Sequence, residues 1–140
     1  MARVTLDLPA SLIFSTELPV RITDINYGDH LGNDALMSLI HEARVRFLVS
    51  HGWSEKCVDG PGIIMTDAVL IYTAQVRYGQ TLVIDIGLAD PTRVGCDVVF
   101  QVSDKASGAE AARAKTGIVF FDYATGRVAR MPDSFRELFT

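Results

Sequence analysis

A polar segment in the first quarter of the chain, residues 24–32 (DINYGDHLG), gathers side chains that can do acid–base chemistry. It carries carboxylates at Asp24 and Asp29, an imidazole at His30 and a carboxamide at Asn26, and Asn33 follows directly. A carboxylate or an imidazole can activate water, and a carboxylate can itself attack a carbonyl carbon. Because the segment is rich in turn formers, we predict that it is a loop.

A long helix is predicted to follow this loop, from Asp34 to His51. Six apolar residues recur there at helical spacing: Leu36, Leu39, Ile40, Ala43, Phe47 and Leu48. We expect Asn33 to cap the helix, Asp34 to suit the positive end of its dipole, and Gly52 to end it. Free N–H groups around Asp34 can hold the negative charge that develops on a carbonyl oxygen. The loop and the helix start are therefore predicted to form one site.

The rest of the chain reads mainly as strands, which must support this helix. Residues 14–23 predict a strand, with Pro19 favouring an edge or a bulge. After the helix, β-branched stretches and turn signals predict four consecutive strands and a short terminal helix capped by Asp133, at residues 63–76, 81–89, 93–103, 111–123 and 133–138. Hairpin-linked strands and one long helix indicate the α+β class. We expect a strongly curved antiparallel sheet wrapped around that helix, with sheet edges that favour pairing between subunits.

The composition of the chain limits the classes of function that it can have. The chain has 140 residues, which predicts a single domain over 1–140. Its net charge of −4 argues against nucleic acid. Its mean hydropathy is +0.23, but no apolar run approaches the roughly 20 residues that a membrane-spanning helix needs. Cys57 and Cys96 suit apolar fillers in a reducing cytoplasm, where we expect the protein because no signal peptide is seen. We expect no metal site and no cofactor, since neither ligand spacing nor a phosphate loop is present.

Three blocks of residues carry a resemblance to a known family. The first is Asp24-Ile-Asn26-Tyr-Gly-Asp-His30-Leu-Gly-Asn33 with His41-Glu42-Ala43-Arg44. The second is Tyr72 with Arg77-Tyr78-Gly79 and Leu82, and the third runs from Ala112-Arg113-Ala114 to Gly126, Pro132 and Leu138. Together they resemble acyl-CoA thioesterases of the hotdog fold, in the 4-hydroxybenzoyl-CoA thioesterase-like branch. The resemblance implies a hotdog fold, hydrolysis of an acyl-CoA or related thioester, and a homodimer or homotetramer.

The chain departs from the family pattern where chemistry is concerned. Asn26 stands where the family carries its catalytic Asp, and Asp29 stands where it usually carries Gly. A carboxamide has no usable basicity, so a hydrolase would need its base elsewhere. Besides His30, the candidates for the catalytic set are the carboxylates Asp24, Asp29 and Glu42 of the family's E-A-R triplet, with Asp67 as a further unusual strand carboxylate.

Each candidate also has a structural interpretation. Asp24 suits a turn residue, Glu42 can pair with Arg44, and Asp67 can pair with an arginine or with backbone donors. The residues predicted to contact substrate are Tyr27, Asn33, Asp67 and Arg77. Tyr27 suits a surface or an interface equally well, and Arg77 is assigned to a CoA phosphate by charge alone.

Two other functions remain open at this stage. Asn26 makes a non-catalytic acyl-thioester binding module a real alternative. The pair Asp24 and His30 also faintly resembles the signature of hotdog enoyl-CoA hydratases, in which an aspartate and a histidine share a water molecule. The spacing here is one residue longer, and the signature's proline is missing.

Overall fold

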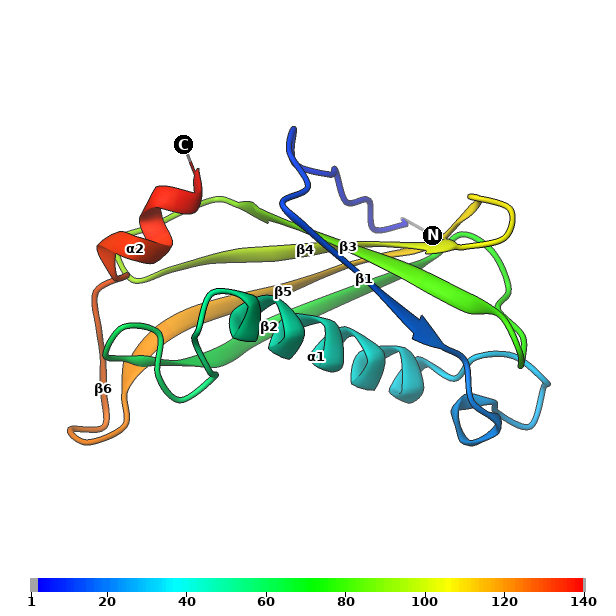
Figure 1. Ribbon diagram of the computed structural model, residues 1–140, viewed down its shortest axis with the longest axis horizontal. Coiled ribbons are helices and arrows are strands. Elements are labelled where there is room, and N and C mark those ends of the chain that lie inside the picture. The colour runs from blue at the N-terminus through cyan, green and yellow to red at the C-terminus, as the bar shows by residue number, and fades with distance from the viewer. Residues whose placement is uncertain (1–2, 140) are drawn as a thin grey trace.

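A computed structural model describes residues 3–139 of the chain. Six strands and two α-helices follow one another (Figure 1), with 3-10 turns at Ile22–Asp24 and Glu137–Phe139. The elements are β1 (Phe14–Pro19), α1 (Asn33–Ser50), β2 (Gly62–Tyr72), β3 (Thr81–Ala89), β4 (Gly95–Asp104), β5 (Glu110–Asp122), β6 (Arg127–Val128) and α2 (Asp133–Arg136).

The strands form one antiparallel sheet in the order β1-β3-β4-β5-β2, and the short β6 pairs with β5. The prediction that consecutive strands are joined by hairpins is right for β3, β4 and β5 and wrong for β2. This strand pairs with β5 at the far edge, so the chain must cross from there to reach β3. This crossing segment, residues 73–80, is held against the loop before α1, because the Leu31 amide donates a hydrogen bond to the Val76 carbonyl at 2.8 Å.

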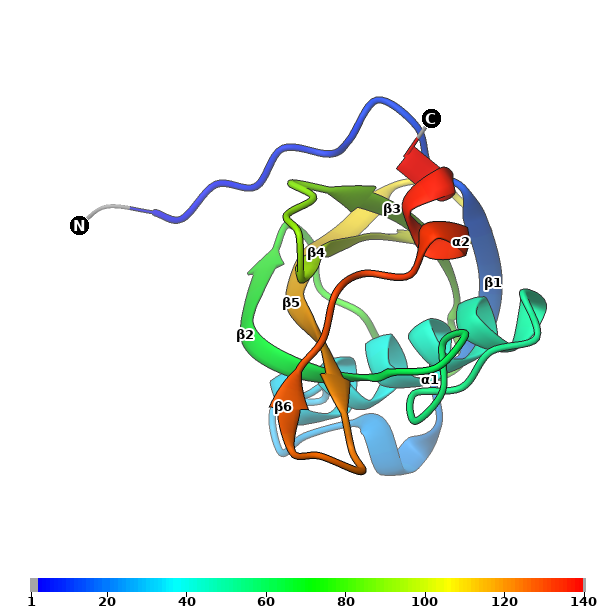
Figure 2. The same ribbon diagram turned by 90° about the vertical axis from the view of Figure 1, so that its left-hand side faces the viewer.

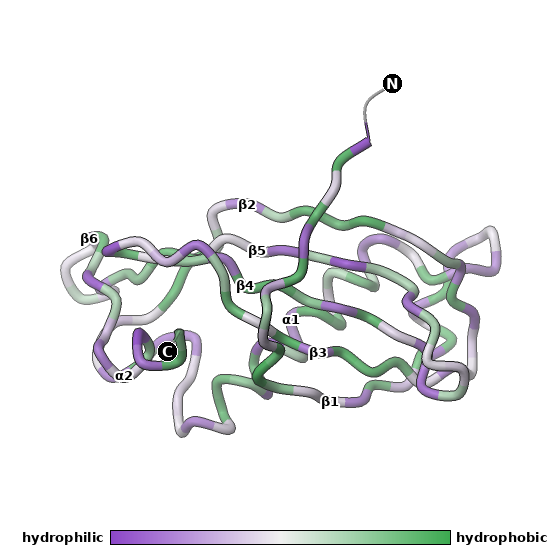
Figure 3. The backbone as a smooth tube through the Cα atoms, turned by 90° about the horizontal axis from the view of Figure 1, so that it is seen from above, coloured by the Kyte–Doolittle hydropathy of each residue, from purple (hydrophilic) through white to green (hydrophobic). Residues whose placement is uncertain are grey.

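The sheet curves over α1, which lies against its concave side (Figure 2). All six apolar residues predicted for the inner face of the helix are buried. Apolar residues also run along β3, whereas the loops at the ends of the sheet are largely hydrophilic (Figure 3). The α+β class and the curved antiparallel sheet are thus as predicted, and they agree with a hotdog fold.

The helix begins one residue earlier than predicted. Gly32 is the N-cap, and its carbonyl accepts the first helical hydrogen bond from the Leu36 amide at 2.9 Å. Asn33 is therefore the first helical residue, and its predicted capping role is wrong. Glycine suits position 32 because a Cβ there would stand 2.6 Å from a carboxylate oxygen of Asp34. At the other end, Gly52 has a φ of +77° and follows the helix as predicted.

Strand ends deviate where hydrogen bonds leave the ladder. The second predicted strand stops at Tyr72 instead of residue 76, because the amides of Thr73 and Ala74 both donate to the Ala111 carbonyl and pairing ends there. The first strand stops at Pro19, and the chain then turns into the first 3-10 turn. At the terminal helix, Pro132 occupies the capping position, so the cap predicted at Asp133 is also one residue off.

Candidate functional site

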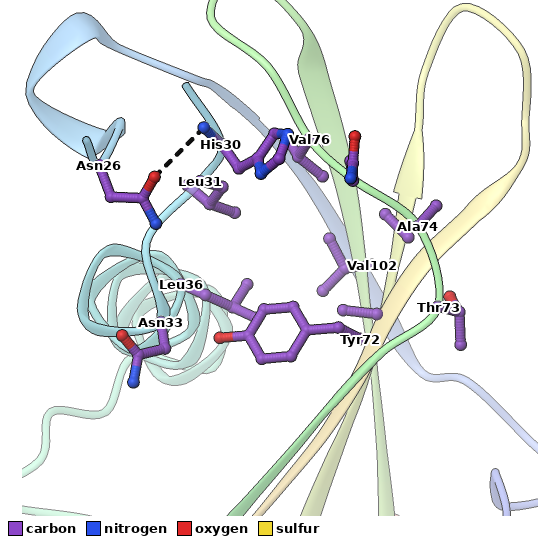
Figure 4. A pocket seen from close by; sticks show the side chains of 13 residues that line it. Asn26, His30, Leu31, Asn33, Leu36, Tyr72, Thr73, Ala74, Val76 and Val102 are labelled. Atoms are coloured by element: carbon purple, nitrogen blue, oxygen red, sulfur yellow. Dashed lines mark hydrogen bonds between the residues drawn. The ribbon is translucent and has the colours of Figure 1, made fainter. Parts of the chain in front are cut away.

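A cavity of about 540 Å³ opens between the loop before α1, the first turn of α1 and the end of β2 (Figure 4). Its polar lining comes from six residues: Asn26, His30, Asn33, Tyr72, Thr73 and Gln75. Its apolar lining includes Leu31, Leu36, Val76 and Val102. The volume lies in the range of small-molecule sites. Three of the residues named from the sequence, Asn26, His30 and Asn33, are thereby brought together.

Asn26 shapes the loop from within. Its side-chain oxygen accepts hydrogen bonds from the Gly28 amide at 2.9 Å and from the His30 amide at 3.3 Å. The backbone amide of Asn26 donates to the His30 carbonyl at 2.8 Å, and this bond closes the turn. Asp29 completes the turn with a φ of +64°, a left-handed conformation that aspartate tolerates better than most residues. Asn26 thus both closes the turn and lines the cavity.

Two polar groups in this cavity are unpartnered within residues 3–139. The carboxamide nitrogen of Asn26 points toward the start of α1, and the ring of His30 points into the cavity (Figure 4). The side-chain hydrogen bonds of the described residues include none from either group. Both can therefore meet a ligand without first breaking a contact.

The first turn of α1 adds backbone donors. Because helical bonding starts with the Leu36 amide, the N–H groups of Asn33, Asp34 and Ala35 precede the helical ladder. In the part of the chain that the structure describes, these three amides make no backbone hydrogen bond. They stand at the positive end of an 18-residue helix. Negative charge on a ligand atom at this end of the cavity would be stabilised.

Tyr72 lines the cavity, although the sequence did not predict it as a site residue; it belongs to the second block of the resemblance. Its hydroxyl points toward the start of α1 (Figure 4). Partial burial raises the pKa of the Tyr72 phenol, and the negative charge of Asp34 raises it further. The hydroxyl is therefore a protonated donor at neutral pH. Leu36 and Gln75 also line the cavity.

Asp24 lies next to the site without lining it. Its buried carboxylate accepts hydrogen bonds from the Arg21 amide at 2.8 Å and from the Arg21 guanidinium at 3.1 and 3.3 Å. Burial raises the pKa of Asp24, but these bonds and the charge of Arg21 outweigh it and hold the pKa below its usual value. With its carboxylate held by Arg21, Asp24 is not set up to share a water with His30, as a hydratase would require.

The remaining candidates lie outside the cavity lining. Asp29 and Tyr27 are at the exposed tip of the loop, and Tyr27 is 104% exposed. Glu42 is on the outer face of α1, where it pairs with Arg46 at 3.0 Å and not with the expected Arg44. Asp67 pairs with Lys115 at 2.7 Å and accepts the Gly117 amide at 3.0 Å. A backbone donor to Asp67 was predicted, but its charged partner is a lysine and not the arginine that was predicted.

Arg44 and Arg77 have other partners. Arg44 is buried and pairs with Glu55 at 3.3 Å, and Glu55 also bonds the ring of His41 at 2.8 Å. This cluster lies further along α1 and does not line the cavity. Arg77 is exposed, and its guanidinium donates to the side chain of Gln75 at 3.4 Å, so it borders the cavity through that residue.

The model of the thioesterase-like superfamily matches residues 20–139, nearly the whole chain. The chain belongs to this superfamily. The match covers the loop, α1 and every strand after it, and it confirms the resemblance seen in the three sequence blocks. No curated protein sequence matches the chain.

Solved structures show the same fold for this thioesterase-like protein. The PA2801 protein of Pseudomonas aeruginosa superposes with a TM-score of 0.85 at 18% identity, over 93% of this chain and 100% of that one. The 1,4-dihydroxy-2-naphthoyl-CoA thioesterase of Synechocystis gives 0.79 at 19% identity, over 89% and 93%. A Staphylococcus aureus protein solved in complex with CoA gives 0.79 at 16% identity, over 96% and 85%.

Two further observations bear on this superfamily member. Within residues 3–139, no helix is long and apolar enough to cross a membrane. The same residues contain no group of three or more His, Cys, Asp or Glu side chains placed to hold a metal ion.

Proposed function

We propose that the protein hydrolyses an acyl-CoA thioester to the free acid and CoA in the cavity before α1. One observation carries the proposal: the Asn26 carboxamide and the His30 imidazole line one cavity with apolar walls, beside Asn33 at the start of α1 (Figure 4), where helix N–H groups lack backbone partners. Membership of the thioesterase-like superfamily supports the reaction class. The CoA bound to the structurally similar Staphylococcus aureus protein supports CoA as the thiol.

The reaction assigns a task to each part of the cavity. The oxygen of a water molecule bonds to the thioester carbonyl carbon and gives up a proton, and the carbonyl π electrons move to its oxygen. The N–H groups of Asn33 and Asp34 and the carboxamide N–H of Asn26 hold that oxyanion. When the carbonyl re-forms, the C–S bond breaks, and its electron pair leaves on sulfur with a proton. The acyl group packs on the apolar lining, including Leu36 and Val102.

A panel of acyl-CoA esters tests this function. We expect the purified protein to release free CoA from at least one short, long or aromatic ester, measured with a thiol reagent that does not react with thioesters. His30→Ala and Asn26→Ala should each lower kcat/KM by about tenfold or more, since each removes one cavity group. Lys105→Gln, at an exposed ion pair with Glu17, is the control and should leave the rate unchanged. A protein that leaves the whole panel intact is not a thioesterase for these substrates.

A second candidate function is a binding module that holds acyl thioesters without cleaving them. It is favoured by one observation: among the lining residues there is no carboxylate. A CoA ester would then raise the melting temperature, because a ligand that binds only the native state stabilises it. Stabilisation without any release of CoA would establish this alternative over hydrolysis.

We further propose that the protein acts as a homodimer or a homotetramer in a reducing cytoplasm. β2 is hydrogen-bonded to β5 on one side, and its residues 65–68 are exposed. Such an edge favours pairing with a second copy. Cys57 and Cys96 are both free thiols, which suits a reducing compartment. Light scattering coupled to size-exclusion chromatography should give a mass of two or four chains of 15.3 kDa. A monomer at micromolar concentration would contradict this assembly.

A further inference from the structure

The proposed hydrolysis still lacks the group that takes a proton from the attacking water. Asn26 cannot do so. The carboxylates expected to replace it are either held by other side chains or lie at the exposed loop tip: Asp24 by Arg21, Glu42 by Arg46, Asp67 by Lys115, and Asp29 at the tip. The imidazole of His30 is one remaining candidate. Another is a carboxylate for which the sequence predicted only an interaction with the helix dipole.

That carboxylate is Asp34, the second residue of α1. Its position is defined by Gly32, because a Cβ on this glycine would stand 2.6 Å from an Asp34 carboxylate oxygen and 3.8 Å from the Asn26 Cβ. The Asp34 carboxylate is therefore folded back over Gly32, on the side where Asn26 enters the cavity. Among the described residues its oxygens have no ion pair and no side-chain hydrogen-bond donor. The carboxylate is exposed to water and available as a base.

A second observation concerns the effect of the Asp34 charge on Tyr72, a residue on the opposite wall of the cavity. The pKa of the Tyr72 phenol is raised by burial and then by the negative charge of Asp34. Tyr72 comes from the end of β2, and its hydroxyl points toward the helix start (Figure 4). Coulombic effects between exposed groups fade over about 10 Å in physiological salt. Asp34 thus lies next to Gly32 and Asn26, within range of a charge interaction with Tyr72, and both Asn26 and Tyr72 line the cavity.

We propose that Asp34 is the general base of this site. It accepts the proton that the carboxamide of Asn26 cannot accept. This inference rests on the proposed function. The Asp34 carboxylate accepts one proton from the water whose oxygen bonds to the thioester carbonyl carbon. The oxyanion forms at the helix N–H groups and the Asn26 carboxamide. When the C–S bond breaks, its electron pair goes to sulfur, and the proton on Asp34 passes to the thiolate, which restores the carboxylate.

The proposal and its competitor differ in which substitution removes the acid limb of the pH profile. A general base must be unprotonated to accept a proton from water, so kcat/KM falls as the pH drops and the base is protonated. If Asp34 is the base, this limb persists in His30→Gln and is lost in Asp34→Asn, and the reverse holds if His30 is the base. The charged groups that lie beside the site, the Arg21–Asp24 pair and Arg77, are present in both variants.

Three variants test Asp34, each compared with a matched control. Asp34→Asn should lower kcat by about 100-fold or more with little change in KM, because general base catalysis contributes about that factor. Asp34→Glu keeps a carboxylate and should retain part of the activity. Gly32→Ala keeps Asp34 but displaces its carboxylate, and should lower kcat by about tenfold. The control is Asp133→Asn, which removes an exposed first-turn carboxylate from α2 at the other end of the molecule.

The placement of Asp34 is tested apart from catalysis by titrating Tyr72. In the Asp34→Asn variant the phenol should ionise at a lower pH than in the wild type, followed by absorbance against a Tyr72→Phe reference. An unchanged titration would contradict the geometry. Wild-type activity that survives Asp34→Asn, or an acid limb of the pH profile that His30→Gln removes, would overturn the role of Asp34 while leaving the hydrolase intact. A wild type that cleaves no ester would refute the proposed function, and the role of Asp34 with it.

Discussion

Replacing Asn26 with aspartate should stabilise the loop. The side-chain oxygen of Asn26 already accepts two amide hydrogens, at 2.9 and 3.3 Å. An aspartate has the same shape, so one carboxylate oxygen can keep both bonds. The other oxygen takes the place of the carboxamide nitrogen, which points toward the start of α1 (Figure 4). The Asn26→Asp variant therefore puts a new base into an unchanged loop.

The size of the stability effect follows from these contacts. Hydrogen bonds to a charged acceptor contribute about 0.5–1 kcal/mol more than neutral ones, and the nearby helix N-terminus adds about 0.3–1 kcal/mol. Repulsion from the Asp34 carboxylate and screening by water act against this gain. We expect a net stabilisation of about 1 kcal/mol, which for a chain of this length raises Tm by about 4 °C.

Thermal melts at two pH values test the mechanism. The hydrogen bonds and the helix dipole should depress the pKa of the new carboxyl in the folded state. Its stabilisation is then fully present above the unfolded value of about 3.9 and is lost as pH falls through the folded value. The Tm difference from wild type should be about 4 °C at pH 7 and small near pH 2.5. A variant that melts below wild type at pH 7, or an increment independent of pH, would refute the reasoning.

Three further predictions concern the rest of the fold. Phe120→Ala should lower the free energy of unfolding by about 3–5 kcal/mol in urea titrations, because the ring is fully buried. Native protein at pH 8 should react with a disulfide reagent quickly at the exposed Cys57 only, since burial raises the pKa of Cys96 to about 12; two fast thiols would contradict this. Glu55→Gln should cost about 2 kcal/mol at neutral pH, because it leaves Arg44 buried without a counter-charge. Burial raises the pKa of Glu55, but its hydrogen bonds to a histidine and to Arg44 outweigh this effect and lower the pKa. The loss of stability caused by Glu55→Gln should therefore become smaller below about pH 4, where Glu55 is protonated in the wild type. An equal loss at neutral and at acid pH would contradict this prediction.

Local pattern was sufficient to predict most elements of this fold. The third predicted strand coincides with β3 (Thr81–Ala89), and the six apolar residues of α1 are buried as expected. What local pattern does not contain is pairing. β2 lies next to β5, about 45 residues further along the chain, and nothing within β2 specifies that partner. Its end at Tyr72 also depends on Ala111, where one carbonyl accepts two amides.

The candidate site was predicted in outline and not in detail. Asn26, His30 and Asn33 line one cavity because the loop folds against the helix that follows it, which is a local event. Carboxylates were misplaced because their partners are set by the folded structure. Asp67 lies beside Lys115 only after β2 and β5 pair. Tyr72 reaches the cavity through the same pairing.

The geometry of the loop also explains why fold and activity must be argued separately here. Asparagine and aspartate can both accept the two amide hydrogens that close the turn at position 26. The fold therefore places no strong demand on which of them is present, whereas the chemistry does. Structural similarity at 18–19% identity shows the fold alone, and this fold does not require a carboxylate at position 26. Catalysis then depends on a base within reach of the thioester carbonyl, and the carboxylate of Asp34, folded back over Gly32, is the group that we propose for this task.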